Sequence, residues 1–109
     1  MPTSGIDAFT IAFVGYTTAD RAARASEYED AVLPLLADHG ARVLYRGRRV
    51  ADQGPDLPHE IHLLWFPDRA AFDAYIADER RVALLEEFGE VFTVKQVVEM
   101  EALDGGFGA

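Results

Sequence analysis

The chain has 109 residues, half of them hydrophobic, and its 10 basic and 19 acidic residues give a net charge of −9. This length fits one domain, and so acidic a surface repels nucleic-acid backbones and anionic membranes, so neither is expected as a partner. The absence of cysteine excludes disulfides, thiolate nucleophiles and Cys-ligated metal centres. The sequence shows no signal-peptide pattern and no apolar run of membrane-spanning length, and we expect a cytoplasmic protein.

The first half of the chain predicts a strand, a helix and a second strand. Residues 9–16 are rich in β-forming side chains and predict the first strand. From 21 to 39 apolar residues recur at steps of three and four, which predicts a helix with one apolar stripe. Pro34 lies inside this helix and should bend it, and Gly40 is a suitable C-cap. Residues 41–48 predict the second strand.

The second half predicts the same kinds of element in a different order. A polar connection rich in helix and strand breakers, 51–58, leads to a third strand at 59–66. Residues 69–78 and 80–88 carry apolar side chains on one side and predict either two short helices or one broken helix. Residues 90–100 predict the last strand.

This βαββαβ order predicts a ferredoxin-like α+β fold, with helices on one face of a four-stranded antiparallel sheet. We expect this domain to span residues 9–102, with an N-terminal arm at 1–8 and a flexible, glycine-rich tail at 103–109.

Both faces of the predicted sheet are too apolar for contact with water. The set expected beneath the helices comprises Phe9, Ile11, Phe13, Val43, Tyr45, Ile61, Leu63, Trp65, Phe92, Val94, Val98 and Met100. The opposite face is expected to carry an apolar patch of Val14, Leu44, Leu64, Phe66 and Val97. A second copy of the chain would cover such a patch, and we therefore expect a homodimer formed through the sheet faces.

Two stretches of the chain resemble a known family. Residues 28–36 and 39–47, which read YEDAVLPLL and HGARVLYRG, are similar to the first half of the domain-of-unknown-function family 1330. LWFPD at 64–68, followed by AFDAY at 71–75, resembles the strand-to-helix junction of that family. The resemblance covers about 9–99 and implies membership of the dimeric α/β-barrel superfamily, and hence the fold and the dimer. That superfamily includes polyketide cyclases, lactone isomerases, cofactor-free monooxygenases and haem proteins, so the resemblance does not choose a reaction.

The residues that can carry chemistry centre on the third strand. Glu60 and His62 are two residues apart and share a face, so with Arg42 or Arg46 nearby they are a candidate general base and its orienting partners. A polar network at the dimer seam is the alternative explanation. His39 and His59 are interpreted as surface or capping residues. No metal site is expected, because His59 and His62 should point to opposite faces.

Aromatic residues are expected to converge between the sheet and the helices, where they either line a pocket for a flat ligand or form ordinary core. This set comprises Trp65, Tyr45, Tyr28, Phe72 and Tyr75. The arginines at 46, 48 and 49 are expected to form intramolecular ion pairs rather than to clamp an acidic substrate.

The leading hypothesis is a homodimeric enzyme that needs no cofactor and uses acid–base chemistry to cyclise or isomerise a carbonyl or aromatic, polyketide-like compound. His62 would be the base, oriented by Glu60, with Tyr45 or Tyr28 as proton donor. The substrate would be held by Trp65, Phe72, Tyr75 and Arg46. The alternatives are a cofactor-free monooxygenase of the same fold, a non-catalytic small-molecule-binding or accessory protein, and a haem protein.

Overall fold

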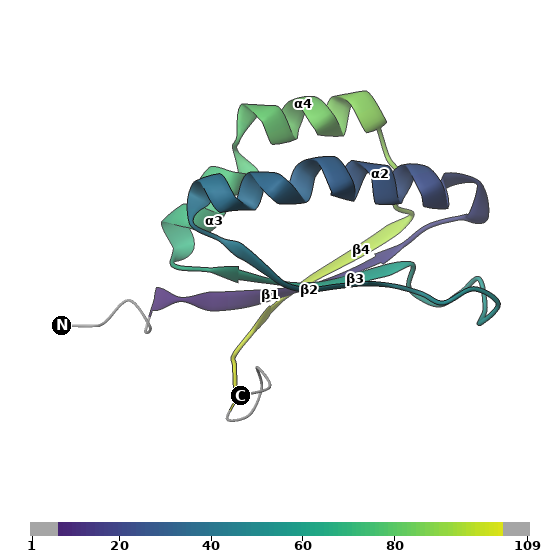
Figure 1. Cartoon of the computed structure of the whole chain (residues 1–109), viewed down its shortest axis with the longest axis horizontal. Helices are drawn as coiled ribbons and strands as arrows, with labels where there is room; N and C mark the ends of the chain where they lie inside the picture. Colours follow the sequence, from purple (N-terminus) through teal and green to yellow (C-terminus); the bar gives the residue numbers. More distant parts are fainter. Residues whose placement is uncertain (1–6, 104–109) are drawn as a thin grey trace.

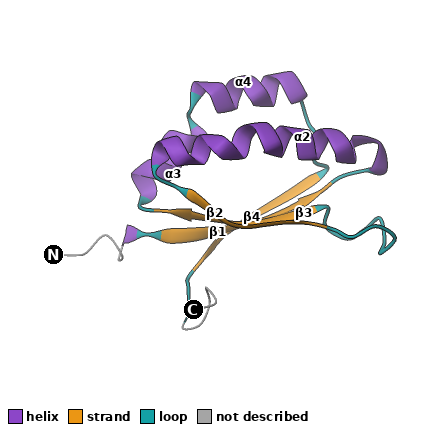
Figure 2. Ribbon diagram, in the orientation of Figure 1, coloured by secondary structure: helices purple, strands orange, loops and turns teal. Residues whose placement is uncertain are grey.

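Four segments rich in β-branched and aromatic residues pair into one antiparallel sheet. The strands are β1 (Phe9–Tyr16), β2 (Arg42–Arg48), β3 (Glu60–Phe66) and β4 (Val94–Met100). Their order across the sheet is β2-β3-β1-β4. The computed structural model describes residues 7–103, and it places helices on one face of this sheet and none on the other (Figures 1 and 2). This is the predicted ferredoxin-like α+β arrangement.

The helices cover the sheet as α2 (Ala22–Val32), α3 (Arg69–Ile76) and α4 (Glu79–Phe88), with 3-10 segments η1 (Ala19–Arg21) and η2 (Leu33–His39). The expected arm at 1–8 and tail at 103–109 lie outside the described residues, apart from 7, 8 and 103. No helix within residues 7–103 is long and apolar enough to cross a membrane.

Helix boundaries follow local chemistry. Pro34 has no backbone N–H for the helical ladder, and at this point the α-helix gives way to the tighter η2 rather than bending as one rod. Gly40 ends η2 with a positive φ of 71°, the left-handed conformation that a glycine C-cap adopts. Asp68 caps α3 by accepting a hydrogen bond from the backbone N–H of Ala71 at 2.8 Å. Asp78 caps α4 in the same way, which makes α3 and α4 two separate helices.

The prediction of which residues face the helices was right for β1 and wrong for β3 and β4. Phe66 and Leu64 pair with Phe9 and Ile11, and all four lie on the helix side, so Leu64 and Phe66 do not belong to the open face. The open face instead carries Ile61, Leu63 and Trp65 from β3 and Val94, Val98 and Met100 from β4. In β2 the ladder shifts register between Val43 and Tyr45, as at a β-bulge, and this turns Tyr45 to the open face as well.

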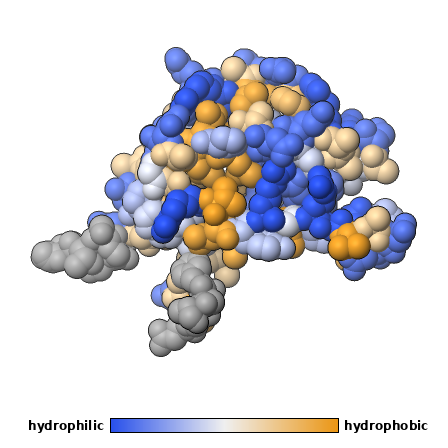
Figure 3. Space-filling view, in the orientation of Figure 1, coloured by the Kyte–Doolittle hydropathy of each residue, from blue (hydrophilic) through white to orange (hydrophobic). Residues whose placement is uncertain are grey.

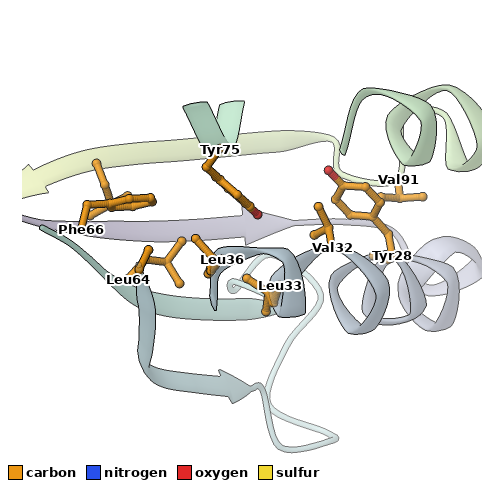
Figure 4. Close-up of a cluster of buried hydrophobic side chains, with 11 residues drawn as sticks. Tyr28, Val32, Leu33, Leu36, Leu64, Phe66, Tyr75 and Val91 are labelled. Atoms are coloured by element: carbon orange, nitrogen blue, oxygen red, sulfur yellow. The ribbon is translucent and has the colours of Figure 1, made fainter. Parts of the chain in front are cut away.

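The core lies between the helices and the sheet, where the largest fully buried apolar side chain is that of Phe66 (Figure 4). Leu64, Phe66, Val32, Leu36 and Tyr75 belong to this cluster. On the side of the molecule shown in Figure 3, hydrophobic residues gather between the helical layer and the sheet, with hydrophilic residues around them. The open face carries a second apolar surface, which no helix of the chain covers.

We predict that Leu36→Ala lowers the free energy of unfolding by about 2–5 kcal/mol, because Leu36 is 1 % exposed and its loss leaves a cavity. Leu103→Ala is the matched control, since Leu103 is 72 % exposed, and it should cost less than about 0.5 kcal/mol. Chemical denaturation of both variants measures the difference. Equal effects would contradict this description of the core.

Candidate functional site

A cavity of about 110 Å³ lies between the sheet and the helices. Most of its wall is apolar and comes from β1, β3, α2 and α3, with residues such as Phe13, Val32 and Phe72. Its polar lining consists of Tyr28, Glu29, His62, Tyr75, Arg81 and Lys95. Lys95 is exposed and Arg81 half-buried, so the cavity reaches the surface beside these two cations. Apolar walls with a few convergent polar groups are typical of small-molecule sites.

His62 is the histidine of this cavity, and its orientation is set by two neighbours. The ring stacks on Phe13, with 4.8 Å between centroids and 22° between planes. Its Nε2 lies 2.8 Å from Oε1 of Glu60. A carboxylate only accepts hydrogen bonds, so Nε2 carries the proton that is donated to Glu60. Nδ1 is then the ring nitrogen that can accept a proton from a ligand.

Glu60 lies behind His62 and is 1 % exposed. Arg46 donates to its two oxygens, from Nε at 2.8 Å and from Nη2 at 3.1 Å, and the Ser26 hydroxyl donates at 2.6 Å. Burial by itself raises the pKa of Glu60, but the hydrogen bonds from His62, Arg46 and Ser26 outweigh burial and lower the pKa well below its usual range. Glu60 is therefore ionised at neutral pH and fixes the tautomer of His62.

Glu29 is a second ionisable group of the cavity, and the sequence analysis missed it. It lies on α2, is 5 % exposed and lines the same cavity as His62. Burial raises the pKa of Glu29 to about 7, and the nearby guanidinium groups of Arg46 and Arg81 only partly oppose this effect. A buried carboxyl whose pKa is close to neutral can hold or release a proton under physiological conditions, which is what acid–base catalysis requires.

A signal for Glu29 was present in the sequence. Ala25, Glu29 and Val32 follow each other at steps of four and three, so Glu29 lies on the apolar stripe of its helix. A carboxylate at such a position is unusual enough to mark a candidate site.

Two tyrosines complete the polar lining, and their hydroxyls point into the space between their rings (Figure 4). Tyr28 extends from α2 and Tyr75 from α3. Burial raises the pKa of Tyr28, and it raises the pKa of Tyr75 to about 12. Both phenols therefore keep their protons at neutral pH and are hydrogen-bond donors toward a bound molecule.

The predicted aromatic cluster is divided between the two faces of the sheet. Tyr28, Phe72 and Tyr75 line the cavity as expected. Tyr45 and Trp65 do not, which corrects the prediction for both residues. Tyr45 is 56 % exposed on the open face, and Trp65 lies on that face under the guanidinium of Arg42, 4.6 Å from the ring centroid. Neither residue can contact a molecule in the cavity.

The remaining predicted polar residues form a structural network. Arg46 bridges Glu60 and Asp30, with its Nη1 2.7 Å from an Asp30 oxygen, so it orients Glu60 and is not part of the cavity wall. This confirms the prediction of intramolecular ion pairs for Arg46. His59 is buried, with Nε2 3.1 Å from the Ser26 hydroxyl, and its interpretation as a surface residue was wrong.

His39 lies apart from the cavity, with Nε2 2.8 Å from an Asp78 oxygen at the start of α4. Within residues 7–103, no group of three His, Asp or Glu side chains is arranged to hold a metal ion.

The family model for the domain of unknown function DUF1330 matches residues 7–99. The chain belongs to this family. No curated protein matches it.

Three solved structures show how widely the fold of this DUF1330 protein is shared. A putative antibiotic biosynthesis monooxygenase from Bacteroides thetaiotaomicron is 16 % identical, with a TM-score of 0.75 over 93 % of each chain. A dimeric protein of unknown function with a ferredoxin-like fold from Bacteroides fragilis is 13 % identical, with a TM-score of 0.67 over 86 % of this chain and 95 % of the other.

The third is a dabb family protein with a ferredoxin-like fold from Mesorhizobium loti. It is 16 % identical, with a TM-score of 0.63 over 89 % of this chain and 98 % of the other. At these identities the three structures establish the fold of the DUF1330 protein and leave its reaction open.

We predict that Glu29→Gln makes the DUF1330 protein more stable at alkaline pH. The glutamate titrates near 4.5 in the unfolded chain and near 7 in the folded one, so wild-type stability falls as the pH rises between these values. The variant lacks this loss and should be more stable than wild type by about 3 kcal/mol at pH 8, with the difference vanishing toward pH 4. Denaturant unfolding across this pH range measures it.

Glu27→Gln is the matched control, because Glu27 is exposed on the same helix and should show little difference at any pH. A constant offset between Glu29→Gln and wild type from pH 4 to pH 8 would contradict the raised pKa.

Proposed function

We propose that this chain is a cofactor-independent enzyme that moves protons on a small carbonyl or aromatic compound and so isomerises or cyclises it. The observation that supports the proposal most strongly is the pair of His62 and Glu29 in one apolar cavity. His62 is oriented by a buried carboxylate, and Glu29 has a pKa of about 7. Enolisation requires a base to remove a proton from carbon and an acid to donate one to oxygen, and a site largely shielded from water favours both transfers.

The roles follow from the hydrogen bonds. Nδ1 of His62 removes a proton from carbon, and the ionised Glu60 stabilises the imidazolium that forms. Glu29 in its protonated form, or the hydroxyl of Tyr28, donates to the oxygen on which negative charge develops. Phe72 and Tyr75 hold the substrate skeleton, while Arg46 acts only through Glu60.

A cofactor-free monooxygenase is the second candidate, and one observation favours it. The structure with the TM-score of 0.75 is a putative antibiotic biosynthesis monooxygenase. Proton removal from a phenol by His62 would be the first step of such a reaction as well, so both candidates share a base. A protein that only binds a small molecule in this cavity is the third.

We also propose that the chain works as a homodimer through the open face of its sheet. That face presents Tyr45, Ile61, Leu63, Trp65, Val94, Val98 and Met100 without any helix above it. An antiparallel sheet face that contacts water is usually polar, and a contiguous apolar patch marks an interaction surface. The structural neighbour from Bacteroides fragilis, of the same fold, is dimeric. A two-fold contact of this face with its copy buries both patches at once.

The expected outcome for catalysis is that the wild-type protein accelerates deuterium uptake at the α-carbon of small ketones or 1,3-dicarbonyl compounds, followed by NMR. His62→Gln should lose about 100-fold or more of this acceleration, since it removes the base. His39→Gln is the control, because His39 lies outside the cavity.

Oxygen uptake with an electron-rich phenol, without such exchange, would favour the monooxygenase. Ligand binding with neither activity would favour the binding protein.

For the dimer, we expect light scattering at micromolar concentration to give twice the mass of one chain. Leu63→Lys should give the mass of one folded chain, because it places a charge in the centre of the open face. Val50→Lys is the matched control, since Val50 is 72 % exposed in the connection between β2 and β3. A wild-type protein of single-chain mass would refute the dimer.

A further inference from the structure

The charge of the cavity differs in sign from the charge of the chain. The whole chain has almost twice as many acidic as basic residues. The cavity lining contains two cations, Arg81 and Lys95, and a single carboxyl, that of Glu29. Burial keeps this carboxyl largely protonated up to about neutral pH. The cavity therefore presents net positive charge in a strongly acidic protein, which favours the binding of an anion there.

Within residues 7–103, neither Arg81 nor Lys95 forms a salt bridge. The ion pairs among residues 7–103 engage other arginines, including Arg46, Arg69 and Arg80. Arg81 donates a long hydrogen bond, 3.3 Å, to the carbonyl of Ile76, and its guanidinium lies beside Tyr75, 5.3 Å from the ring centroid. In a chain with 19 acidic residues, a half-buried arginine without a carboxylate is available to a ligand.

We infer that the cavity takes a small organic carboxylate, whose charge is met by Arg81 and Lys95 at the mouth while its carbon skeleton lies against His62. This inference names the substrate class of the proposed function and rests on it. This arrangement would bind the ligand in one orientation, because the two cations lie where the cavity opens and His62 lies on the sheet. A bound carboxylate would hold the neighbouring carbonyl and its α-carbon toward His62 and Glu29.

The size of the cavity limits the ligand. A closed apolar cavity of about 150 Å³ holds the six carbon atoms of benzene, so about 110 Å³ suits roughly four or five non-hydrogen atoms of a ligand whose carboxylate lies at the mouth. A second hollow of about 420 Å³ shares Tyr28, Phe92 and Lys95 with the cavity. Lys95 thus lies at the junction of two hollows, and a longer substrate would extend past it along the surface. In such a longer substrate, the atoms that react would still lie in the small cavity beside His62.

Acetoacetate and acetoacetamide test the inference, because they have the same size and an enolisable carbon but differ in charge. NMR titration should show acetoacetate binding about tenfold or more tightly than the amide. Arg81→Gln and Lys95→Gln should each weaken acetoacetate binding about tenfold and leave amide binding within about twofold. Lys95 is exposed, so its replacement leaves the fold intact even if Arg81→Gln proves unstable.

Arg24→Gln is the matched control. Arg24 is an exposed arginine that packs on Phe88, 4.3 Å from the ring centroid, and does not line the cavity. It should leave both affinities unchanged. Equal binding of the acid and the amide, or equal losses in all three variants, would overturn the inference.

Deuterium uptake in the same samples separates this inference from the proposed function. Exchange of the amide catalysed as well as that of the acid would leave the acid–base function standing and overturn the carboxylate preference. Selective binding of acetoacetate that depends on Arg81 and Lys95, without any exchange, would support the carboxylate site and refute the catalysis.

Discussion

The buried carboxylate of Glu60 is the interaction on which the arrangement of this protein depends. A lone charge removed from water costs several kcal/mol, and here four hydrogen bonds from three side chains offset that cost. The donors come from different elements: Ser26 from α2, Arg46 from β2 and His62 from β3 itself. Glu60 therefore fixes the position of the long helix above the sheet. Glu29 follows Ser26 by three residues, close to one helical turn, and this docking turns it toward the cavity that His62 lines.

The polar network around Glu60 lies between two different environments, the protein surface and the apolar cavity. On the side of Arg46 and Asp30, the network is saturated with ion pairs and reaches the surface. On the side of His62, it ends against aromatic rings, where each remaining polar group faces apolar walls. Protein dipoles and charges are strongest in such a poorly solvated place, because little water screens them. The same residues thus stabilise the fold on one side and orient the polar lining of the cavity on the other.

The order of the elements could be predicted from the sequence, because hydrophobic periodicity, Gly40 and Asp68 mark the helices and strands locally. The facing of the strands could not. Alternation separates two sets of residues in β3, but both are largely apolar, so apolarity does not say which set is buried. The buried set contains Glu60 and His62, and their partners Arg46 and Ser26 lie 14 and 34 residues from Glu60 in sequence.

The site residues on helices were predicted correctly, and those on strands were not, because the sequence did not reveal which way each strand faces. Tyr28, Phe72 and Tyr75 lie on helices whose apolar stripes were recognised, and they line the cavity. Tyr45 and Trp65 lie on strands, where a shift of one residue reverses the facing of a side chain, and in β2 such a shift occurs at Leu44. That irregularity also has a bearing on aggregation. β2 is an edge strand, whose free backbone groups invite a foreign strand to pair. By interrupting the regular spacing of donors and acceptors, the bulge makes this edge of the sheet a poorer template for such pairing.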